Sequence, residues 1–338
     1  MFEEKDHQKN KSCPCSNSPV NMVELKQDWS LDILPRYFTL EDYEGGVPRW
    51  CDGCGDHGIL RVVQRIFRDE QLLPEKTVCV SGIGCSSRFP HYMSTYGFHS
   101  LHGRAFPVAC GIKSRRPDLD VWVATGDGDC CSIGAGHWIH AVRYNMNMVA
   151  ILFDNNVYAL TKKQSSPTSR RGQSTNTHPE GAWLPPLNPS TTTLSITNCS
   201  FVAQTVDWNP VHMYETLRAA HQHKGFSFVR IFQRCPVFSA ECFSKPQNDP
   251  DLVQLLEHEN GLQVPESGTR SYKNRQAHNP SDLVEAIAFS KQEDVYPIGL
   301  LYQNEDVPRY DEICAVGIHT TPRDKIRALN QQLDRFAI

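Results

Sequence analysis

The chain has 338 residues, of which 39% are hydrophobic, and its formal net charge is -4. That is enough apolar material for the core of one large domain or two small ones. The weak negative charge gives no support for a nucleic acid or an anionic membrane as a partner, and no apolar run approaches the ~20 residues of a bilayer helix. The start, Met1 to Asp6, lacks the basic and apolar segments of a secretory signal, so we expect a cytoplasmic protein.

Residues 1–47 are rich in charged and small polar residues and show little hydrophobic periodicity. We expect them to form a weakly ordered N-terminal extension. The extension contains Cys13-Pro14-Cys15, but two thiolates alone rarely hold a metal.

From residue 48 the chain alternates between helical and strand patterns. Helices are expected near 57–68, 103–114, 132–145 and 210–223, and strands near 77–80, 120–125, 148–153, 201–206 and 227–232. This order predicts an α/β domain over 48–235 with a mostly parallel sheet and helices on both faces. A long proline-containing segment interrupts the alternation at 155–200, and loops of that length are usually functional.

After Cys235 the alternation weakens. We expect a charged helix near 281–292, a strand at 297–302 and a last helix near 322–336. Residues 236–338 are therefore interpreted as an arm that packs on the core or on a partner.

The most informative motif is Gly126-Asp127-Gly128, which follows one expected strand, with Asn155-Asn156 after the next. A carboxylate beside a diphosphate repels it unless a divalent cation lies between them. Mg²⁺ commonly shares a carboxylate with substrate phosphates, so Asp127, the Asn155 amide oxygen and a loop carbonyl predict a cation cage. This spacing resembles the thiamine diphosphate enzymes. A dinucleotide fold ranks lower because the sixth position of the glycine fingerprint is Cys131, and two ordinary turns are the simplest alternative.

Thirteen cysteines exceed the needs of core packing in a reducing compartment. Cys51 and Cys54 lie at the start of a helix, whereas Cys85 and Cys235 each follow a strand, so all four are able to converge on one site. Zinc or a redox pair would also suit such thiols, but an iron–sulfur cluster is the electron acceptor that makes chemical sense beside thiamine. We expect no role for the other cysteines of the core and C-terminal segments, which are Cys79, Cys110, Cys130, Cys131, Cys199, Cys242 and Cys314.

With both sites in view, the chain resembles the β subunits of the 2-oxoacid:ferredoxin oxidoreductases from about Trp50 to Tyr310. The matching segments are Trp50-Cys-Asp-Gly-Cys-Gly-Asp56, Ser81-Gly-Ile-Gly-Cys-Ser86, Leu101-His-Gly-Arg104, Gly126-Asp-Gly-Asp129, Asn156-Val-Tyr158, Leu160-Thr-Lys162, Ser166-Pro-Thr168 and Pro297-Ile-Gly-Leu-Leu-Tyr302. The chain departs from the family at Asp52, where a proline is common, and in its longer N-terminal extension.

The resemblance implies three cofactors: thiamine diphosphate, Mg²⁺ and a [4Fe-4S] cluster. By it, the cluster ligands are Cys51, Cys54, Cys85 and Cys235, and Mg²⁺ is held by Asp127, Asn155 and the carbonyl of Val157. The residues that it places against thiamine diphosphate are Ile83, Gly84, Cys85, Ser86, His102, Gly128, Asp129, Ala159 and Leu160.

The segment Gly84 to Gly103 is most similar to family members that use 2-oxoglutarate. Arg88 is the candidate clamp for the distal carboxylate of that substrate, and with His102 and Leu160 it completes the expected catalytic set. An interface or surface arginine is the alternative for Arg88, and pyruvate or a broad range of 2-oxoacids is the alternative substrate.

The family reaction is the oxidative decarboxylation of the 2-oxoacid with coenzyme A, here to succinyl-CoA and CO₂, or the reverse carboxylation, with electrons exchanged with ferredoxin. The family assigns the carboxylate that acts on the aminopyrimidine to an α subunit, so we expect an (αβ)₂ assembly. Two other hypotheses stay open: a zinc-stapled scaffold without turnover, and a thiamine decarboxylase without a redox step.

Overall fold

The computed structural model describes residues 36–314 and 321–336. Most of the expected N-terminal extension, with Cys13 and Cys15, lies outside the described residues. Phe38 opens the compact unit. Tyr43 is completely buried, and its hydroxyl donates to the carbonyl of Leu72 at 2.8 Å. The last ten residues that we expected in the extension therefore pack with the core.

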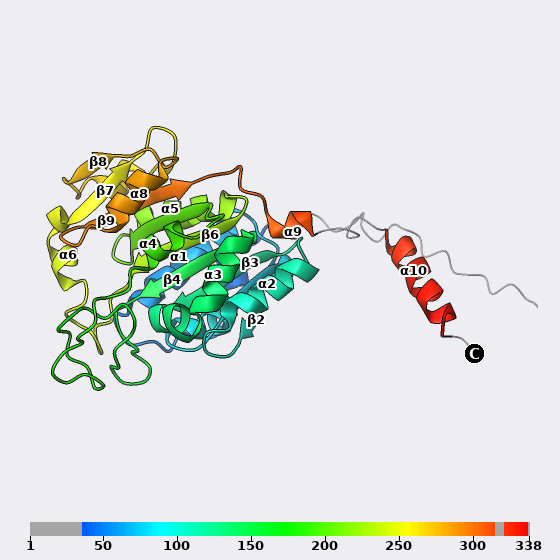
Figure 1. Cartoon of the computed structure of the whole chain (residues 1–338), viewed down its shortest axis with the longest axis horizontal. Helices are drawn as coiled ribbons and strands as arrows, with labels where there is room; N and C mark the ends of the chain where they lie inside the picture. Colours follow the sequence, from blue (N-terminus) through cyan, green and yellow to red (C-terminus); the bar gives the residue numbers. More distant parts are fainter. Residues whose placement is uncertain (1–35, 315–320, 337–338) are drawn as a thin grey trace, which may run out of the picture. The chain divides into compact units, whose positions relative to one another are not determined.

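The described residues form a sheet in the order β2-β1-β3-β4-β6-β5-β9-β7-β8 (Figure 1). The strands are β1 Thr77–Ser81, β2 Tyr96–His99, β3 Asp120–Gly126, β4 Met148–Asp154, β5 Phe201–Val206, β6 Phe226–Phe232, β7 Val253–Glu257, β8 Arg275–Ala277 and β9 Tyr296–Gln303. Every neighbouring pair is parallel except β5 and β9. The predicted mostly parallel sheet is confirmed.

The helices are α1 Gly55–Asp69, α2 Ala105–Arg115, α3 Ala135–Tyr144, α4 Pro189–Leu194, α5 Pro210–Gln222, α6 Ser244–Asn248, α7 Glu266–Thr269, α8 Leu283–Ser290, α9 Tyr310–Ile313 and α10 Pro322–Asp334. Local sequence sets several of their ends. The Asn209 side chain accepts a hydrogen bond from the amide of His212 and caps α5, and Pro210 fills its first position. At the C-terminal end of α3, Asn145 takes the left-handed conformation that ends the helix.

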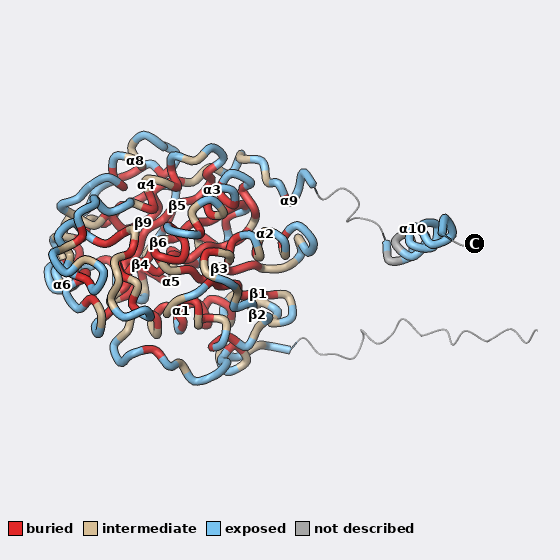
Figure 2. The backbone as a smooth tube through the Cα atoms, turned by 60° about the horizontal axis from the view of Figure 1, so that its bottom comes forward, coloured by how far each residue is buried: buried red, intermediate tan, exposed pale blue. Residues whose placement is uncertain are grey.

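Two apolar clusters cover the two faces of the sheet. Alternate residues of a strand point to opposite faces, so on β3 Trp122 joins the cluster under α1 and α5, whereas Val121 and Val123 join the cluster under α2 and α3. Figure 2 shows the buried backbone concentrated in these central strands. This two-sided burial explains the nearly continuous apolar runs in the sequence.

The segment 236–338, expected to be an arm, contributes strands to the sheet itself. β9 pairs with β5 on one side and with β7 on the other, and β8 lies beyond β7. The sequence predicted β9 but not β7 or β8, which are only five and three residues long. Short strands at a sheet margin leave little periodicity to detect.

The parallel order fixes where the motifs lie. β1, β3, β4 and β6 are adjacent and parallel, so the loops that follow them leave the same edge of the sheet. Those loops carry Cys85, Asp127, Asn155 and Cys235. The fold therefore brings the four strand-end motifs of the sequence to one place.

Candidate active site

A cavity of about 410 Å³ lies at this edge, within the size range of small-molecule sites. Its wall includes every residue that the family resemblance placed against thiamine diphosphate, and also the three expected Mg²⁺ ligands. These residues are Ile83, Gly84, Cys85, Ser86, His102, Asp127, Gly128, Asp129, Asn155, Val157, Ala159 and Leu160. Residues from four separate loops thus form one continuous surface.

Asp127 lies in the buried part of that wall. Two side-chain hydroxyls donate hydrogen bonds to the same oxygen of its carboxylate, Oδ2: Ser166 Oγ at 2.5 Å and Thr168 Oγ1 at 2.6 Å. Burial and the nearby Asp154 carboxylate raise the pKa of Asp127 to about 7. A bound cation would favour the ionised form, so the surroundings of Asp127 fit a metal ligand.

Asn155 and Val157 complete the expected cation cage on the next loop. The amide oxygen of Asn155 accepts a hydrogen bond from the backbone N–H of Val157 at 3.2 Å, which fixes the side chain. Between them, Asn156 has a φ of 59°, a left-handed conformation that asparagine tolerates well. This local turn brings the side chain of Asn155 and the backbone of Val157 to the same wall as Asp127.

Asp129 lies two residues after Asp127, and hydrogen bonds within the protein hold its carboxylate in place. Its carboxylate accepts hydrogen bonds from the amides of Ile83 and Gly103 and from the Thr125 hydroxyl, at 3.0, 2.7 and 2.8 Å. Its Oδ1 also lies 2.8 Å from Nδ1 of His102. The carboxylate thereby joins three loops and orients the imidazole at the cavity wall.

Two glycines make room for this arrangement. A methyl group on Gly82 would lie 2.1 Å from the Asp129 carboxylate, and one on Gly128 would lie 2.0 Å from the ring of Tyr158. Neither position has space for any side chain. The glycines allow the backbone to approach the cavity and permit the Asp129 contacts.

The four candidate cluster ligands lie near one another on the same side of the cavity. Cys51 is exposed, Cys54 and Cys85 are half-buried and Cys235 is buried. Cys85 is close enough to Cys235 and Cys51 for their charges to contribute to its pKa, which burial raises to about 12. No three His, Cys, Asp or Glu side chains of the described ranges meet closely enough for a single metal ion.

Two buried polar side chains lie between the cysteines and the cavity. Among residues 36–314 and 321–336, neither carboxylate oxygen of Asp56 has a hydrogen-bond partner, and burial, with the charge of Asp207, raises the pKa of Asp56 to about 7. Gln233 donates to the sulfur of Cys54 at 3.4 Å, but its own Oε1 is unpaired. Both residues line the cavity. Unpaired buried oxygens at the wall are consistent with a polar group bound there.

Arg88 has a different position from the other predicted catalytic residues. His102 and Leu160 line the cavity, but Arg88 is not among its lining residues. The Arg88 guanidinium donates to the carbonyl of Arg49 at 3.3 Å, and its charge lowers the pKa of Cys85, partly offsetting the effect of burial. Arg88 therefore lies on the cysteine side of the site.

Sequence reasoning gave no role to several residues that build the site, namely Asp56, Asp154, Tyr158, Ser166, Thr168, Arg230 and Gln233. A signal was present for some of them. Ser166 and Thr168 form the Ser-Pro-Thr segment, and Asp154 directly precedes the Asn-Asn pair. The motifs identified the positions, but only the fold shows which atoms meet.

Comparison with known protein families agrees with a thiamine diphosphate site at this cavity. Residues 82–231 match the model of the C-terminal, thiamine pyrophosphate-binding domain of thiamine pyrophosphate enzymes. Residues 268–317 match the model of the C-terminal part of the pyruvate ferredoxin oxidoreductase β subunit. Together the two matches include most of the residues that line the cavity, and the strands β8 and β9.

Individual relatives are similar over much of the chain. A 2-oxoglutarate oxidoreductase subunit KorB of Mycobacterium tuberculosis is 48% identical over 58% of this chain, which is about half (52%) of that relative's length. A 2-oxoacid:ferredoxin oxidoreductase β subunit of Sulfolobus is 38% identical over 78% of this chain and 84% of its own.

A solved structure extends the likeness to three dimensions. It is a 2-oxoglutarate:ferredoxin oxidoreductase from Magnetococcus marinus with 2-oxoglutarate, coenzyme A and succinyl-CoA bound. The TM-score is 0.72 at 36% identity, with 86% of this chain and 96% of that chain covered. The predicted family resemblance and the thiamine diphosphate-binding fold are confirmed. Along the described residues, no helix is both long and apolar enough to span a bilayer.

The close contact between Gly82 and Asp129 gives a first prediction. Gly82→Ala should displace the Asp129 carboxylate and lower the free energy of unfolding by about 1 to 3 kcal/mol, as overpacking does. Gly111→Ala is the matched control, because Gly111 lies exposed within α2 with open space around it and should gain up to ~1 kcal/mol. Urea unfolding of the full chain measures both. Equal stability of the two variants would contradict the assigned role of Gly82.

Proposed function

We propose that this chain, which belongs to the family of the 2-oxoacid:ferredoxin oxidoreductase β subunits, supplies the cofactor half of a 2-oxoglutarate oxidoreductase. The enzyme converts 2-oxoglutarate and coenzyme A to succinyl-CoA and CO₂, and a pair of electrons passes through an iron–sulfur cluster to ferredoxin; the reverse carboxylation uses the same site. The observation that carries the proposal is that Asp127, Asn155 and Cys85 line one cavity, with the other three candidate cluster ligands near Cys85. We place the enzyme in the cytoplasm.

The cavity residues divide the work of binding. Asp127, Asn155 and the Val157 carbonyl would hold Mg²⁺ against the diphosphate, and Gly128 permits its close approach. Thiamine diphosphate, when bound, supplies the nucleophilic carbon and the electron sink for loss of CO₂. His102, oriented by Asp129 through Nδ1, offers Nε2 as a proton donor or acceptor at the wall.

The remaining predicted contacts form the sides of the cofactor pocket. The turn Ile83–Gly84–Cys85–Ser86 comes from the end of β1, and Ala159 and Leu160 come from the loop after β4. Cys85 belongs both to this turn and to the proposed cluster ligands. A shared residue keeps the cofactor and the cluster adjacent, which is what single-electron transfer between them requires.

The proposed cluster gives a second prediction. Cys235→Ser should lose iron, acid-labile sulfide and the broad visible absorbance of a [4Fe-4S] centre, because one of four thiolate ligands is gone. The control is Cys199→Ser, since Cys199 is buried in the apolar cluster on one face of the sheet. An anaerobic visible spectrum with metal and sulfide analysis provides the measurement. A full cluster in Cys235→Ser would remove that ligand from the assignment, and colourless wild-type protein with zinc would support the scaffold hypothesis.

The substrate assignment rests on the likeness to relatives that are named for 2-oxoglutarate and on the candidate clamp Arg88. Pyruvate has no second carboxylate, so the clamp would discriminate between the two substrates. A charge-assisted hydrogen bond to a buried carboxylate is a strong basis for such selectivity. Arg88 reaches this role only if its side chain leaves the Arg49 carbonyl when substrate enters.

Arg88→Ala tests this assignment. We expect the kcat/KM for 2-oxoglutarate to fall by the equivalent of ~2 to 5 kcal/mol. The kcat/KM for pyruvate or 2-oxobutyrate should fall much less. Arg65→Ala, at an exposed position of α1, should leave both unchanged. Equal losses on all three substrates would assign Arg88 a structural or coenzyme A role instead.

The second half of the site is proposed to come from an α subunit in an (αβ)₂ assembly. The family assigns the carboxylate for the aminopyrimidine to that subunit, and the motifs of this chain contain no glutamate for the role. The segments 155–200 and 236–338 are our candidate interface. In the first of them, the exposed Trp183 and Leu184 are the apolar side chains expected at such a contact.

Isolated chain should therefore be inactive with 2-oxoglutarate, coenzyme A and an artificial electron acceptor, and addition of the α subunit should restore turnover. Trp183→Ser should raise the α-subunit concentration needed for half-maximal activity, whereas the same change at another exposed position should not. Turnover by the isolated chain at the rate of the reconstituted pair would refute the split site. Release of CO₂ without reduction of the acceptor would indicate a decarboxylase.

A further inference from the structure

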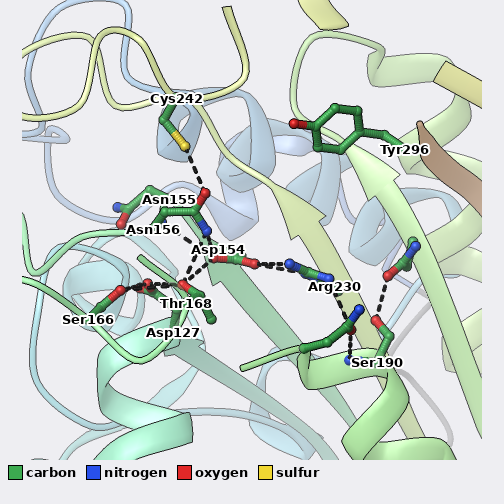
Figure 3. Close-up of polar contacts among 12 residues, drawn as sticks. Asp127, Asp154, Asn155, Asn156, Ser166, Thr168, Ser190, Arg230, Cys242 and Tyr296 are labelled. Carbon is green, nitrogen blue, oxygen red and sulfur yellow. Dashed lines mark hydrogen bonds and ion pairs between the residues drawn. The ribbon is translucent and has the colours of Figure 1, made fainter. Parts of the chain in front are cut away.

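Behind Asp127, away from the cofactor cavity, a chain of buried polar side chains leads to β6 (Figure 3). Thr168 is its central member. Its hydroxyl oxygen lies 2.6 Å from Oδ2 of Asp127 and 2.9 Å from Oδ1 of Asp154. Thr168 does not line the cofactor cavity; it lines a second cavity of about 860 Å³ on the other side. Thr168 therefore reaches the cofactor site through its neighbours: its hydroxyl contacts Asp127, and it also accepts a hydrogen bond from the side-chain amide of Asn156 at 3.2 Å.

One hydroxyl between two carboxylates has a single proton to donate. Asp154 has other donors: the Asn156 amide reaches its Oδ1 at 2.8 Å, and Arg230 reaches its Oδ2 through Nε at 2.7 Å and Nη2 at 2.6 Å. Arg230 also neutralises the charge of Asp154, which is completely buried. The Thr168 proton is thus free for Asp127.

Among the described residues, Asp127 has no cationic partner comparable to the Arg230 that pairs with Asp154. Its side-chain donors are the hydroxyls of Thr168 and Ser166, and both bind Oδ2. The backbone of Gly128 also hydrogen-bonds the carboxyl group of Asp127. The two hydroxyls on one oxygen fix the plane of the carboxylate, and they leave Oδ1 without a side-chain donor among the described residues. For a cation ligand this matters, because Mg²⁺ demands near-ideal octahedral geometry.

We propose that Thr168 is a positioning residue for the cation site: supported by the Asp154–Arg230 pair, its hydroxyl anchors Oδ2 of Asp127 so that Oδ1 is left to bind the metal. The inference rests on the proposed function, since it takes the cation to be the Mg²⁺ of a thiamine diphosphate site. It adds to that function the residues that orient the metal-binding carboxylate, none of which touches the cofactor cavity except Asp127 itself.

The experiment is a titration of Mg²⁺ at fixed thiamine diphosphate, with cofactor binding followed by calorimetry on the full chain in complex with its α subunit. Thr168→Val keeps the shape and removes the hydroxyl. Loss of a hydrogen bond to a charged group should raise the half-saturating Mg²⁺ concentration about tenfold or more. Thr168→Ser restores a hydroxyl and should return the requirement to within a few-fold of wild type.

Thr193→Val is the matched control. Thr193 is also completely buried, and its hydroxyl donates to the carbonyl of Pro189 within α4, away from the site. Its Mg²⁺ requirement should equal that of wild type, and its thermal stability without ligands shows what the same change costs elsewhere. Ser166→Ala, which removes the other hydroxyl from Oδ2, should shift the Mg²⁺ requirement in the same direction as Thr168→Val.

The outcomes separate the two proposals. Asp127→Ala should abolish Mg²⁺-dependent binding; if wild type itself binds no cofactor with Mg²⁺, the proposed function fails. If wild type and Asp127→Ala behave as expected but Thr168→Val and Ser166→Ala keep the wild-type requirement, only the positioning role is overturned. Equal losses in Thr168→Val and Thr168→Ser would also overturn it, because the hydroxyl would then not be the cause.

Discussion

The burial of carboxylates at one sheet edge is the constraint on which the rest of this structure depends. Five nearly inaccessible aspartates gather there: Asp56, Asp127, Asp129, Asp154 and Asp207. A buried charge is costly unless it is paired or hydrogen-bonded. Asp154 and Asp207 are paired with arginines, and Asp129 is bound by backbone amides and a hydroxyl. Within the part of the chain that the structure describes, Asp127 has hydroxyl donors but no cationic partner, and the carboxylate oxygens of Asp56 have no hydrogen-bond partner. Both of these incompletely compensated carboxylates line the cavity, beside the expected Mg²⁺ ligands and Cys85.

This difference separates scaffold from binding group. Asp129 and Asp154 are satisfied by the protein alone, so their positions do not depend on a ligand. Burial raises the pKa of Asp127 to about 7, so near neutral pH the cavity holds a carboxyl group whose charged form is disfavoured. A divalent cation reverses that balance, because it stabilises the charged form directly. If Asp127 holds the cation as proposed, binding of that cation would be linked to release of a proton from this carboxyl group.

The sequence predicted the residues that line the cavity better than the buried partners behind them. Asp127 and Asn155 follow adjacent parallel strands, and parallel strands end at one edge, so spacing alone brings them together. The partners behind them depend on side-chain contacts across 14 residues between Asp154 and Thr168, and 76 between Asp154 and Arg230. The periodicity of hydrophobic residues along the sequence does not reveal contacts between residues so far apart. Arg88 illustrates the same limit, because its place three residues after Cys85 does not determine the direction of its side chain. The short β7 and β8 were missed for a different reason, since too few residues alternate in them.

The rim of the cavity links the chemistry to assembly. Ile83 and Leu160 line the cavity, yet 38% and 47% of their surfaces are exposed. Trp183 and Leu184 of the segment 155–200 are more exposed still. Because Ile83 and Leu160 are exposed beside the polar part of the cavity wall, a cofactor bound there would be open to water on one side. A second apolar surface placed over this rim would exclude water and strengthen every charge interaction below it. The same surface is where an α subunit would bring the missing carboxylate, so closing the cavity and completing the catalytic groups would be one event.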